Sequence, residues 1–171
     1  MVDFEDFLSY LKSQDFYCGQ ISHIEHLPEL RPRFENLDKP LRKRLERWLS
    51  NKDIRLWRHQ VEAINSIRQG NNTVIVTSTA SGKSLCYNLP VLDALLNNEK
   101  TTALYLFPTK ALARDQFFQL KEILTDTNIK ENRIGVYDGD TNPNEKRYIL
   151  ANANIIITNP FGLHFYLPPE I

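Results

Sequence analysis

Apolar residues change their spacing near residue 71, and this change divides the chain into two regions. Before it, apolar positions recur at the spacing of an amphipathic helix, which predicts helices over 3–13, from Pro40 to Leu49, and over 57–69. Gly70 stands where a C-terminal cap is expected. Residues 15–39 contain several prolines and little periodicity, so we expect an irregular arm there.

After residue 71 the pattern becomes one of short apolar runs separated by helix-forming stretches. The runs cover residues 73–77, 102–107, 133–137 and 154–158. Alternation of such runs with helices is typical of βαβ units and a parallel sheet. The sequence therefore predicts an α/β fold, a parallel sheet with flanking helices, over 53–171, preceded by a mainly helical accessory arm over 1–52.

Composition and charge exclude few classes of function. The 171 residues carry a formal net charge of +0, which gives no overall signature for a nucleic-acid or membrane partner. Ten Lys and Arg stand against four acids between Arg31 and Arg58, a stretch that is read first as a solvated helix face. No apolar run is long enough to span a membrane and the N-terminus does not resemble a signal peptide, so no membrane partner and a cytoplasmic location are expected.

Candidate metal ligands are few. Cys18 and Cys86 lack metal-ligand spacing, and His23 and His26 have no neighbouring cysteine or further histidine to complete a metal shell. Surface histidines are the preferred interpretation.

The stretch TSTASGKS, residues 77–84, carries the chemistry. Apart from its first glycine, replaced by Thr77, it matches the phosphate-binding pattern G-x-x-x-x-G-K-[ST]. It follows a predicted strand and opens a predicted helix, where backbone N–H groups and the helix dipole favour an anion. Lys83 would reach the β- and γ-phosphates of a nucleotide, and the Ser84 hydroxyl would hold Mg²⁺. The alternative is a chance GKS in a flexible loop.

A second polar element, LWRHQVEAI, precedes the loop. The planar amide of Gln60 can donate and accept at once, which matches the edge of adenine. Trp57 or Arg58 could stack on or flank the base.

The order of these stretches, with PTKALA, YDGDT and ITNP after them, resembles the first half of a superfamily 2 helicase motor. Within it, TASGKSLCYNLPVL and LYLFPTKALA resemble the YprA/MrfA-like branch of the DEAD/DEAH-box helicases, whose RecA-like domain would be truncated here. The resemblance implies ATP and Mg²⁺ as cofactors, Lys83 and Ser84 as catalytic residues, and Ser84 as the magnesium ligand. It implies nucleotide contacts from Arg58, Gln60, Thr79, Ala80, Ser81, Gly82, Lys83, Ser84 and Leu85.

The same resemblance implies nucleic acid as a partner, DNA rather than RNA. The contacts it implies come from three later motifs, namely Pro108, Thr109 and Lys110; Gly139, Asp140 and Thr141; and Thr158, Asn159 and Pro160.

The carboxylates of the family's DE-x-H box and its second RecA-like lobe are absent from these residues. Asp138 follows a predicted strand and could imitate the missing acid, although the G-D-T turn explains it better. We therefore expect an ATP-binding half of a DNA helicase, with weak nucleotide binding, negligible hydrolysis and the rest of the motor as its partner. The alternatives are a non-catalytic fragment that binds nucleotide or nucleic acid, and an unrelated P-loop enzyme such as a small-molecule kinase.

Overall fold

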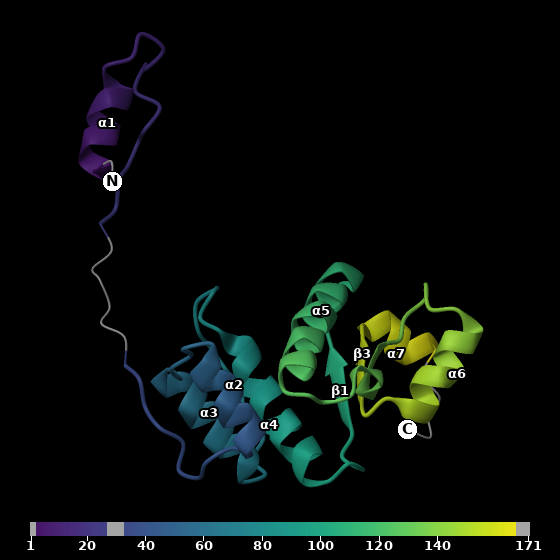
Figure 1. Ribbon diagram of the computed structural model, residues 1–171. Coiled ribbons are helices and arrows are strands. Elements are labelled where there is room, and N and C mark those ends of the chain that lie inside the picture. Colours follow the sequence, from purple (N-terminus) through teal and green to yellow (C-terminus); the bar gives the residue numbers. More distant parts are fainter. Residues whose placement is uncertain (1–2, 27–32, 167–171) are drawn as a thin grey trace. The chain divides into compact units, whose positions relative to one another are not determined.

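A computed structural model describes residues 3–26 and 33–166, with the side chains of 165 and 166 left out. By contacts the chain separates into two units, Met1–Pro32 and Arg33–Ile171. In the first unit, α1 (Phe4–Lys12) begins at Asp3, whose side chain accepts a hydrogen bond from the Glu5 N–H. Leu8 is buried within this unit, while the neighbouring aromatic side chains of the helix are exposed. The helix predicted over 3–13 is thus present (Figure 1).

The second unit is an α/β domain, as predicted. Its elements are α2 (Lys43–Asn51), α3 (Arg58–Arg68), α4 (Lys83–Asn97), β1 (Ala103–Leu106), α5 (Lys110–Asp126), η1 (Glu131–Arg133), β2 (Ile134–Val136), α6 (Pro143–Asn152), β3 (Ile155–Thr158) and α7 (Pro160–Tyr166). The three strands form a parallel sheet in the order β1-β3-β2, with Ala103 and Ile134 both level with Ile155.

The middle strand carries the core of the sheet. All four residues of β3 are buried, and Ile157 is fully enclosed. The connections β1–α5–β2 and β2–α6–β3 cross the sheet in opposite directions, so right-handed crossovers place α5 and α6 on opposite faces. Figure 1 shows these two helices on either side of the strands. On the α6 side Gly135 leaves room for Ile149, whose side chain would lie 2.7 Å from an added Cβ.

The strand predicted over 73–77 is absent, and residues 71–78 form no regular secondary structure. A strand needs a neighbour to bond its backbone, and no described strand lies beside this segment. Val74 and Val76 are 90% and 89% exposed. Their β-branched side chains favour a strand, but this propensity does not form one without backbone hydrogen bonds to a neighbouring strand.

Other predictions hold with shifts of a few residues. The second helix begins at Lys43 rather than near Pro40, and α3 ends at Arg68, with Gly70 beyond it in the left-handed region at φ +85°. Helix α7 was not predicted. Leu41, Leu45 and Trp48, on the arm side of the boundary predicted at residue 52, pack in one core with residues of the sheet domain. The two-domain division itself stays a prediction. Among the described residues, no helix has the length and apolarity needed to cross a bilayer.

Candidate functional site

The loop of residues 77–84 enters α4 through two residues in the left-handed region. Gly82 is the N-cap at φ +70°, a conformation that glycine adopts without strain. Ala80 stands at φ +58°, where an alanine is strained. The loop therefore turns sharply into the helix, and the first backbone N–H groups of α4 lie beside it.

The Lys83 side chain lies back over the loop. Its Nζ donates to the Thr77 carbonyl oxygen at 3.1 Å, to the Ser81 hydroxyl at 3.3 Å, and to the Ser78 carbonyl oxygen. The Thr77 and Ser81 hydroxyl oxygens lie 2.6 Å apart. The Lys83 ammonium thus donates hydrogen bonds to several oxygens of the loop. Phosphate oxygens of a bound nucleotide could replace these loop oxygens as its acceptors.

Helix α3 fastens the other side of this loop. Gln60 is 2% exposed; its Oε1 accepts from the Trp57 N–H and its Nε2 donates to the Gly82 carbonyl oxygen, both at 2.9 Å. His59 Nε2 lies 3.0 Å from the Ser81 carbonyl oxygen. The amide of Gln60, read from the sequence as a contact to adenine, therefore bonds the phosphate loop in this structure. Its contact with adenine stays a prediction.

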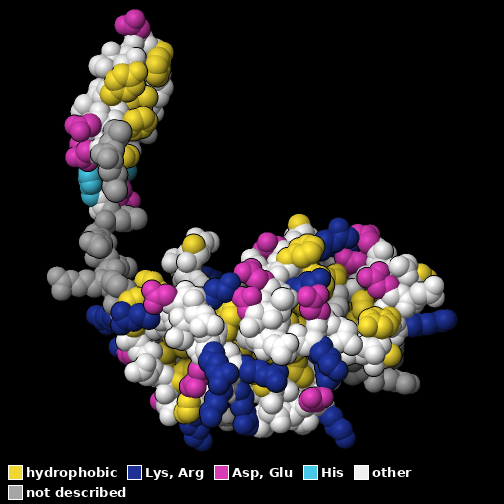
Figure 2. All heavy atoms as spheres, in the orientation of Figure 1, with side chains coloured by type: hydrophobic (Ala, Val, Ile, Leu, Met, Phe, Trp, Pro, Cys, Tyr) yellow, Lys and Arg dark blue, Asp and Glu magenta, His cyan; other side chains and the backbone are white. Residues whose placement is uncertain are grey.

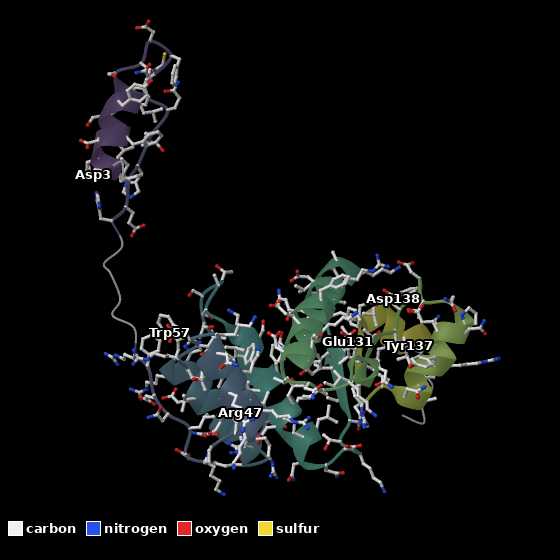
Figure 3. The ribbon with its side chains drawn as sticks, in the orientation of Figure 1. Asp3, Arg47, Trp57, Glu131, Tyr137 and Asp138 are labelled. Atoms are coloured by element: carbon white, nitrogen blue, oxygen red, sulfur yellow. The ribbon has the colours of Figure 1, made fainter. Side chains whose placement is uncertain are left out.

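The remaining predicted nucleotide contacts lie around this loop. Thr79 and Ala80 are exposed, Ser84 and Leu85 are half-buried, and the Leu85 N–H bonds the Gly82 carbonyl. Arg58 is exposed and pairs with Glu62 at 2.7 Å and with Glu35 at 3.6 Å. Trp57, labelled in Figure 3, has its ring tilted against Phe34 at 5.4 Å.

The three motifs predicted to contact nucleic acid meet at one edge of the sheet. Each follows a strand, and the carboxyl ends of parallel strands lie at the same edge. Lys110 Nζ lies 2.7 Å from Asp140 Oδ1, and Arg114 lies 3.2 Å from Oδ2 of the same carboxylate. The hydrogen bond that Lys110 donates to Asp140 holds the pKa of the Asp140 carboxyl below its usual value and raises the pKa of Lys110.

The members of this set differ in accessibility. Pro108, Thr109, Gly139 and Pro160 are exposed and Thr141 is half-buried. Thr109 caps α5 by accepting from the Leu112 N–H.

Thr158 and Asn159 are buried at the junction of β3 and α7. The Thr158 hydroxyl donates to the Tyr137 carbonyl oxygen, and Asn159 Oδ1 accepts from the Gly162 N–H at 2.7 Å. A Cβ at Gly162 would lie 2.5 Å from the Thr158 hydroxyl oxygen, so the junction needs a glycine. These contacts give both side chains a structural role, and their contact with nucleic acid stays a prediction.

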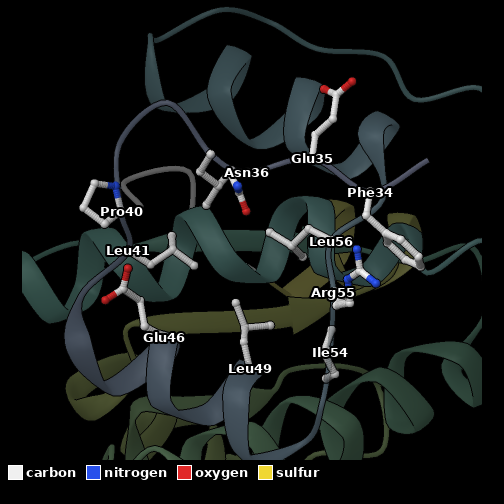
Figure 4. Close-up of a pocket in the computed structure, with 11 residues that line it drawn as sticks. Phe34, Glu35, Asn36, Pro40, Leu41, Glu46, Leu49, Ile54, Arg55 and Leu56 are labelled. Carbon is white, nitrogen blue, oxygen red and sulfur yellow. The ribbon is translucent and has the colours of Figure 1, made fainter. Parts of the chain in front are cut away.

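Two cavities lie away from the phosphate loop. One of about 500 Å³ lies between residues 34–41, α2 and residues 54–56. Apolar side chains line it together with Glu35, Asn36, Glu46 and Arg55 (Figure 4). The other, of about 540 Å³, has a basic lining, formed by Arg42, Lys43, Arg44, Lys130 and Arg133. No residue of the loop lines either cavity.

The basic stretch is only partly a solvated face. The Arg42 side chain donates to Asn97, and Arg44 donates to the Asn128 carbonyl oxygen at 3.3 Å. Figure 2 shows Lys and Arg side chains gathered on the lower part of the visible face of the second unit. Among the described residues, no cluster of three or more His, Cys, Asp or Glu could hold a metal ion.

A phosphate-type loop opening a helix, beside a parallel sheet with helices on both faces, defines a nucleotide-binding domain of the RecA-like P-loop class. Residues 57–169 match the family model of the DEAD/DEAH box helicases, and the chain belongs to this family.

Relatives agree over nearly the whole chain. The ATP-dependent helicase HRQ1 of Saccharomyces cerevisiae is 41% identical over 161 residues, which are 94% of this chain and 15% of that protein. The helicase YprA of Bacillus subtilis is 44% identical over 141 residues, 82% of this chain and 18% of that protein. The crystal structure of the DUF1998 helicase MrfA bound to DNA and AMPPNP superposes with a TM-score of 0.85 and 36% identity, over 96% of this chain and 23% of that chain. The chain thus spans less than a quarter of each of these relatives.

Several residues of the site escaped the sequence reading. His59 contacts the Ser81 carbonyl oxygen, 22 positions along the chain, and no local pattern in the sequence predicts this contact. Thr77 had been noted only as a departure from the usual glycine, yet it supplies two oxygens to Lys83.

Proposed function

We propose that this chain is the ATP-binding half of an ATP-dependent DNA helicase motor. The observation that carries the proposal is the phosphate-type loop, with the Lys83 ammonium set among its oxygens and Gly82 at the helix entrance. In support, MrfA is crystallised with DNA and AMPPNP, and HRQ1 and YprA are named ATP-dependent helicases. The decisive test is whether binding of Mg²⁺–ATP requires Lys83.

The residues present fit this nucleotide. Lys83 would bond the terminal phosphates, the α4 N–H groups would face them, and the Ser84 hydroxyl would hold Mg²⁺. Bound Mg²⁺ neutralises charge on the phosphates during phosphoryl transfer. Lys110 and Thr109, exposed at the carboxyl edge of the sheet, would contact the sugar–phosphate backbone of DNA, with Gly139, Thr141 and Pro160 beside them.

We propose further that the motor continues with strands that complete this sheet. Residues 73–77 have the composition of a buried strand but expose Val74 and Val76, and the edge strand β1 leaves Leu104 and Leu106 nearly half exposed. Strands from the remainder of the motor would pair with both. Alone, the chain would bind nucleotide without turnover, because neither a DE-x-H carboxylate nor a second lobe is among its residues.

This proposal predicts the behaviour of the segment 73–77. In the 171-residue chain, the Val74 and Val76 amide protons should exchange with solvent almost as fast as in an unfolded peptide, because no ladder protects them. In a longer protein that supplies the next strands, both should be protected along with the rest of the sheet. Hydrogen exchange followed by NMR or mass spectrometry compares the two, and fast exchange in both proteins would contradict strand completion.

The contacts of Gln60 predict a variant that separates two roles. Gln60→Ala removes the hydrogen bond to the Gly82 carbonyl, which contributes about 1 kcal/mol. The affinities for ATP and for inorganic tripolyphosphate should therefore fall by the same factor, about fivefold to tenfold. If Gln60 contacted adenine instead, its replacement would lower the affinity for ATP and leave the affinity for tripolyphosphate unchanged. Competition titrations with both ligands decide this. Gln119→Ala on the exposed surface of α5 is the control and should change neither affinity.

A further inference from the structure

A pocket of about 340 Å³ lies at the outer edge of the sheet, along β2 and between α5 and α6. Phe117 and Phe118 line it from α5, and Glu145 and Tyr148 line it from α6. Figure 3 places Asp138, which also lines the pocket, between these two helices. Asp140 and Thr141, two of the predicted nucleic-acid contacts, line one end of this pocket, while the function proposed above does not use the edge of β2.

The backbone of β2 offers two groups to this pocket. The Tyr137 N–H bonds the Ile157 carbonyl oxygen, which fixes Gly135 and Tyr137 as the residues bonded to β3. Ile134 and Val136 therefore direct their backbone groups to the outer edge, since alternate residues of a strand face opposite neighbours. Two of these groups have internal partners, the Ile134 N–H with the Glu131 carbonyl and the Val136 carbonyl with the Thr141 hydroxyl. The Ile134 carbonyl and the Val136 N–H have no such partner among the described residues, and they are the pair that remains for a further strand.

A buried carboxylate stands at the end of the same strand. Asp138 is 2% exposed, and its Oδ1 accepts from the Asp140 N–H at 2.9 Å and from the Thr141 hydroxyl at 3.3 Å. Its Oδ2 is buried without a hydrogen-bond partner among the described residues. A buried carboxylate oxygen without a partner is destabilising, so a donor that reached it would bind favourably.

The rest of the lining selects the kind of donor. Arg114 lines the pocket and, with Lys110, pairs with the Asp140 carboxylate. Asp138, Asp140 and Glu145 together outnumber these two cations, so the pocket keeps an excess of one negative charge among the described residues. Phe118 and Tyr148 are 65% and 54% exposed at the rim. Carboxylates beside exposed aromatic rings suit a guanidinium, which can be both hydrogen-bonded and held over a ring.

We propose that this edge binds an extended peptide of a partner protein, which adds to the sheet as a strand parallel to β2. The carbonyl of Ile134 and the N–H of Val136 match the two bonds that one residue of a parallel strand makes. Apolar side chains of the peptide would pack between Phe118 and Tyr148. An arginine near its C-terminal end would reach Asp138, because the carboxyl end of β2 lies there.

The test uses the whole chain and a capped hexapeptide in which valine and threonine alternate before a final arginine. We expect the Val136 amide to exchange at least tenfold more slowly with saturating peptide. Binding should weaken at least tenfold in Asp138→Asn and equally when citrulline, the neutral isostere, replaces the arginine. Asp115→Asn, which removes an exposed carboxylate of α5 outside the pocket, should leave the affinity unchanged.

Asparagine keeps an oxygen for the Asp140 N–H and the Thr141 hydroxyl, and the citrulline peptide tests the same ion pair on the unaltered chain. Absence of binding at millimolar peptide, or equal affinity of the citrulline peptide, would overturn the proposal. So would protection of Val136 by single-stranded oligothymidine instead of the peptide, since the edge would then take nucleic acid. The outcome is independent of ATP binding, because no residue of the phosphate loop lines this pocket.

Discussion

Replacing Gly82 with alanine should reduce the affinity for Mg²⁺–ATP at least tenfold. The left-handed conformation at φ +70° costs an alanine about 1–2 kcal/mol. The added Cβ would also lie 2.5 Å from Gln60 Nε2. Gln60 is buried and bonded at both ends of its amide, so it can move only by releasing the loop from α3. Isothermal titration calorimetry with Mg²⁺–ATP measures the loss.

Gly70→Ala is the matched control for this variant. Gly70 stands at φ +85°, so an alanine there suffers the same backbone strain, but nothing lies within 4 Å of its Cβ. Gly70→Ala should lower stability by about 1 kcal/mol and leave ATP affinity unchanged. Equal losses of ATP affinity in the two variants would mean that the contact between Gly82 and Gln60 does not shape the phosphate loop.

Replacing Ile157 with alanine should destabilise the domain by about 2–5 kcal/mol. The side chain is fully enclosed in the middle strand, where a cavity cannot be filled by a small movement. Leu104→Ala, on the edge strand β1 and 45% exposed, should lower stability by less than about 1 kcal/mol. Denaturant unfolding followed by circular dichroism compares the two variants, and similar losses would contradict the strand order β1-β3-β2.

Helix periodicity and propensity were sufficient for most of the fold, because those signals are local. The helices over 83–97 and 110–126 lie in the helix-forming stretches between the predicted strands, and the buried strand at 155–158 lies within a residue of its predicted position. The strand over 73–77 failed because pairing depends on distant residues. Its valines favour an extended backbone, but the segment pairs with no described strand.

In the candidate site, too, the sequence predicted the features that depend on neighbouring residues and missed a contact between residues far apart in the chain. The motif placed Gly82, Lys83 and Ser84 at the entrance to a helix, since the spacing of a phosphate loop is local. The bond from Gln60 to Gly82 joins residues that are 22 positions apart, and no spacing rule showed it. Asp138 was read as a possible substitute for the missing acid, with the G-D-T turn as the better explanation, and its Oδ1 accepts from the Asp140 N–H and the Thr141 hydroxyl within that turn.

Thr77, which replaces the usual first glycine of the loop, and Ala80, in the left-handed region, have different consequences. Thr77 directs its carbonyl and its hydroxyl toward Lys83, so a residue larger than glycine is accommodated there. Ala80 keeps the left-handed conformation at φ +58° at some cost in strain. Neither change removes Lys83 or the helix entrance from the position that a phosphate cradle requires.

Titration of Mg²⁺–ATP into this chain, beside Lys83→Ala, tests the phosphate cradle most directly. Lys110→Ala is the matched control, because it removes one lysine ammonium from the edge of the sheet while leaving the loop untouched. The account predicts micromolar-to-millimolar binding that is lost in Lys83→Ala and kept in Lys110→Ala. Equal binding by the unaltered chain and by folded Lys83→Ala would contradict it, as would no heat at all from the folded, unaltered chain.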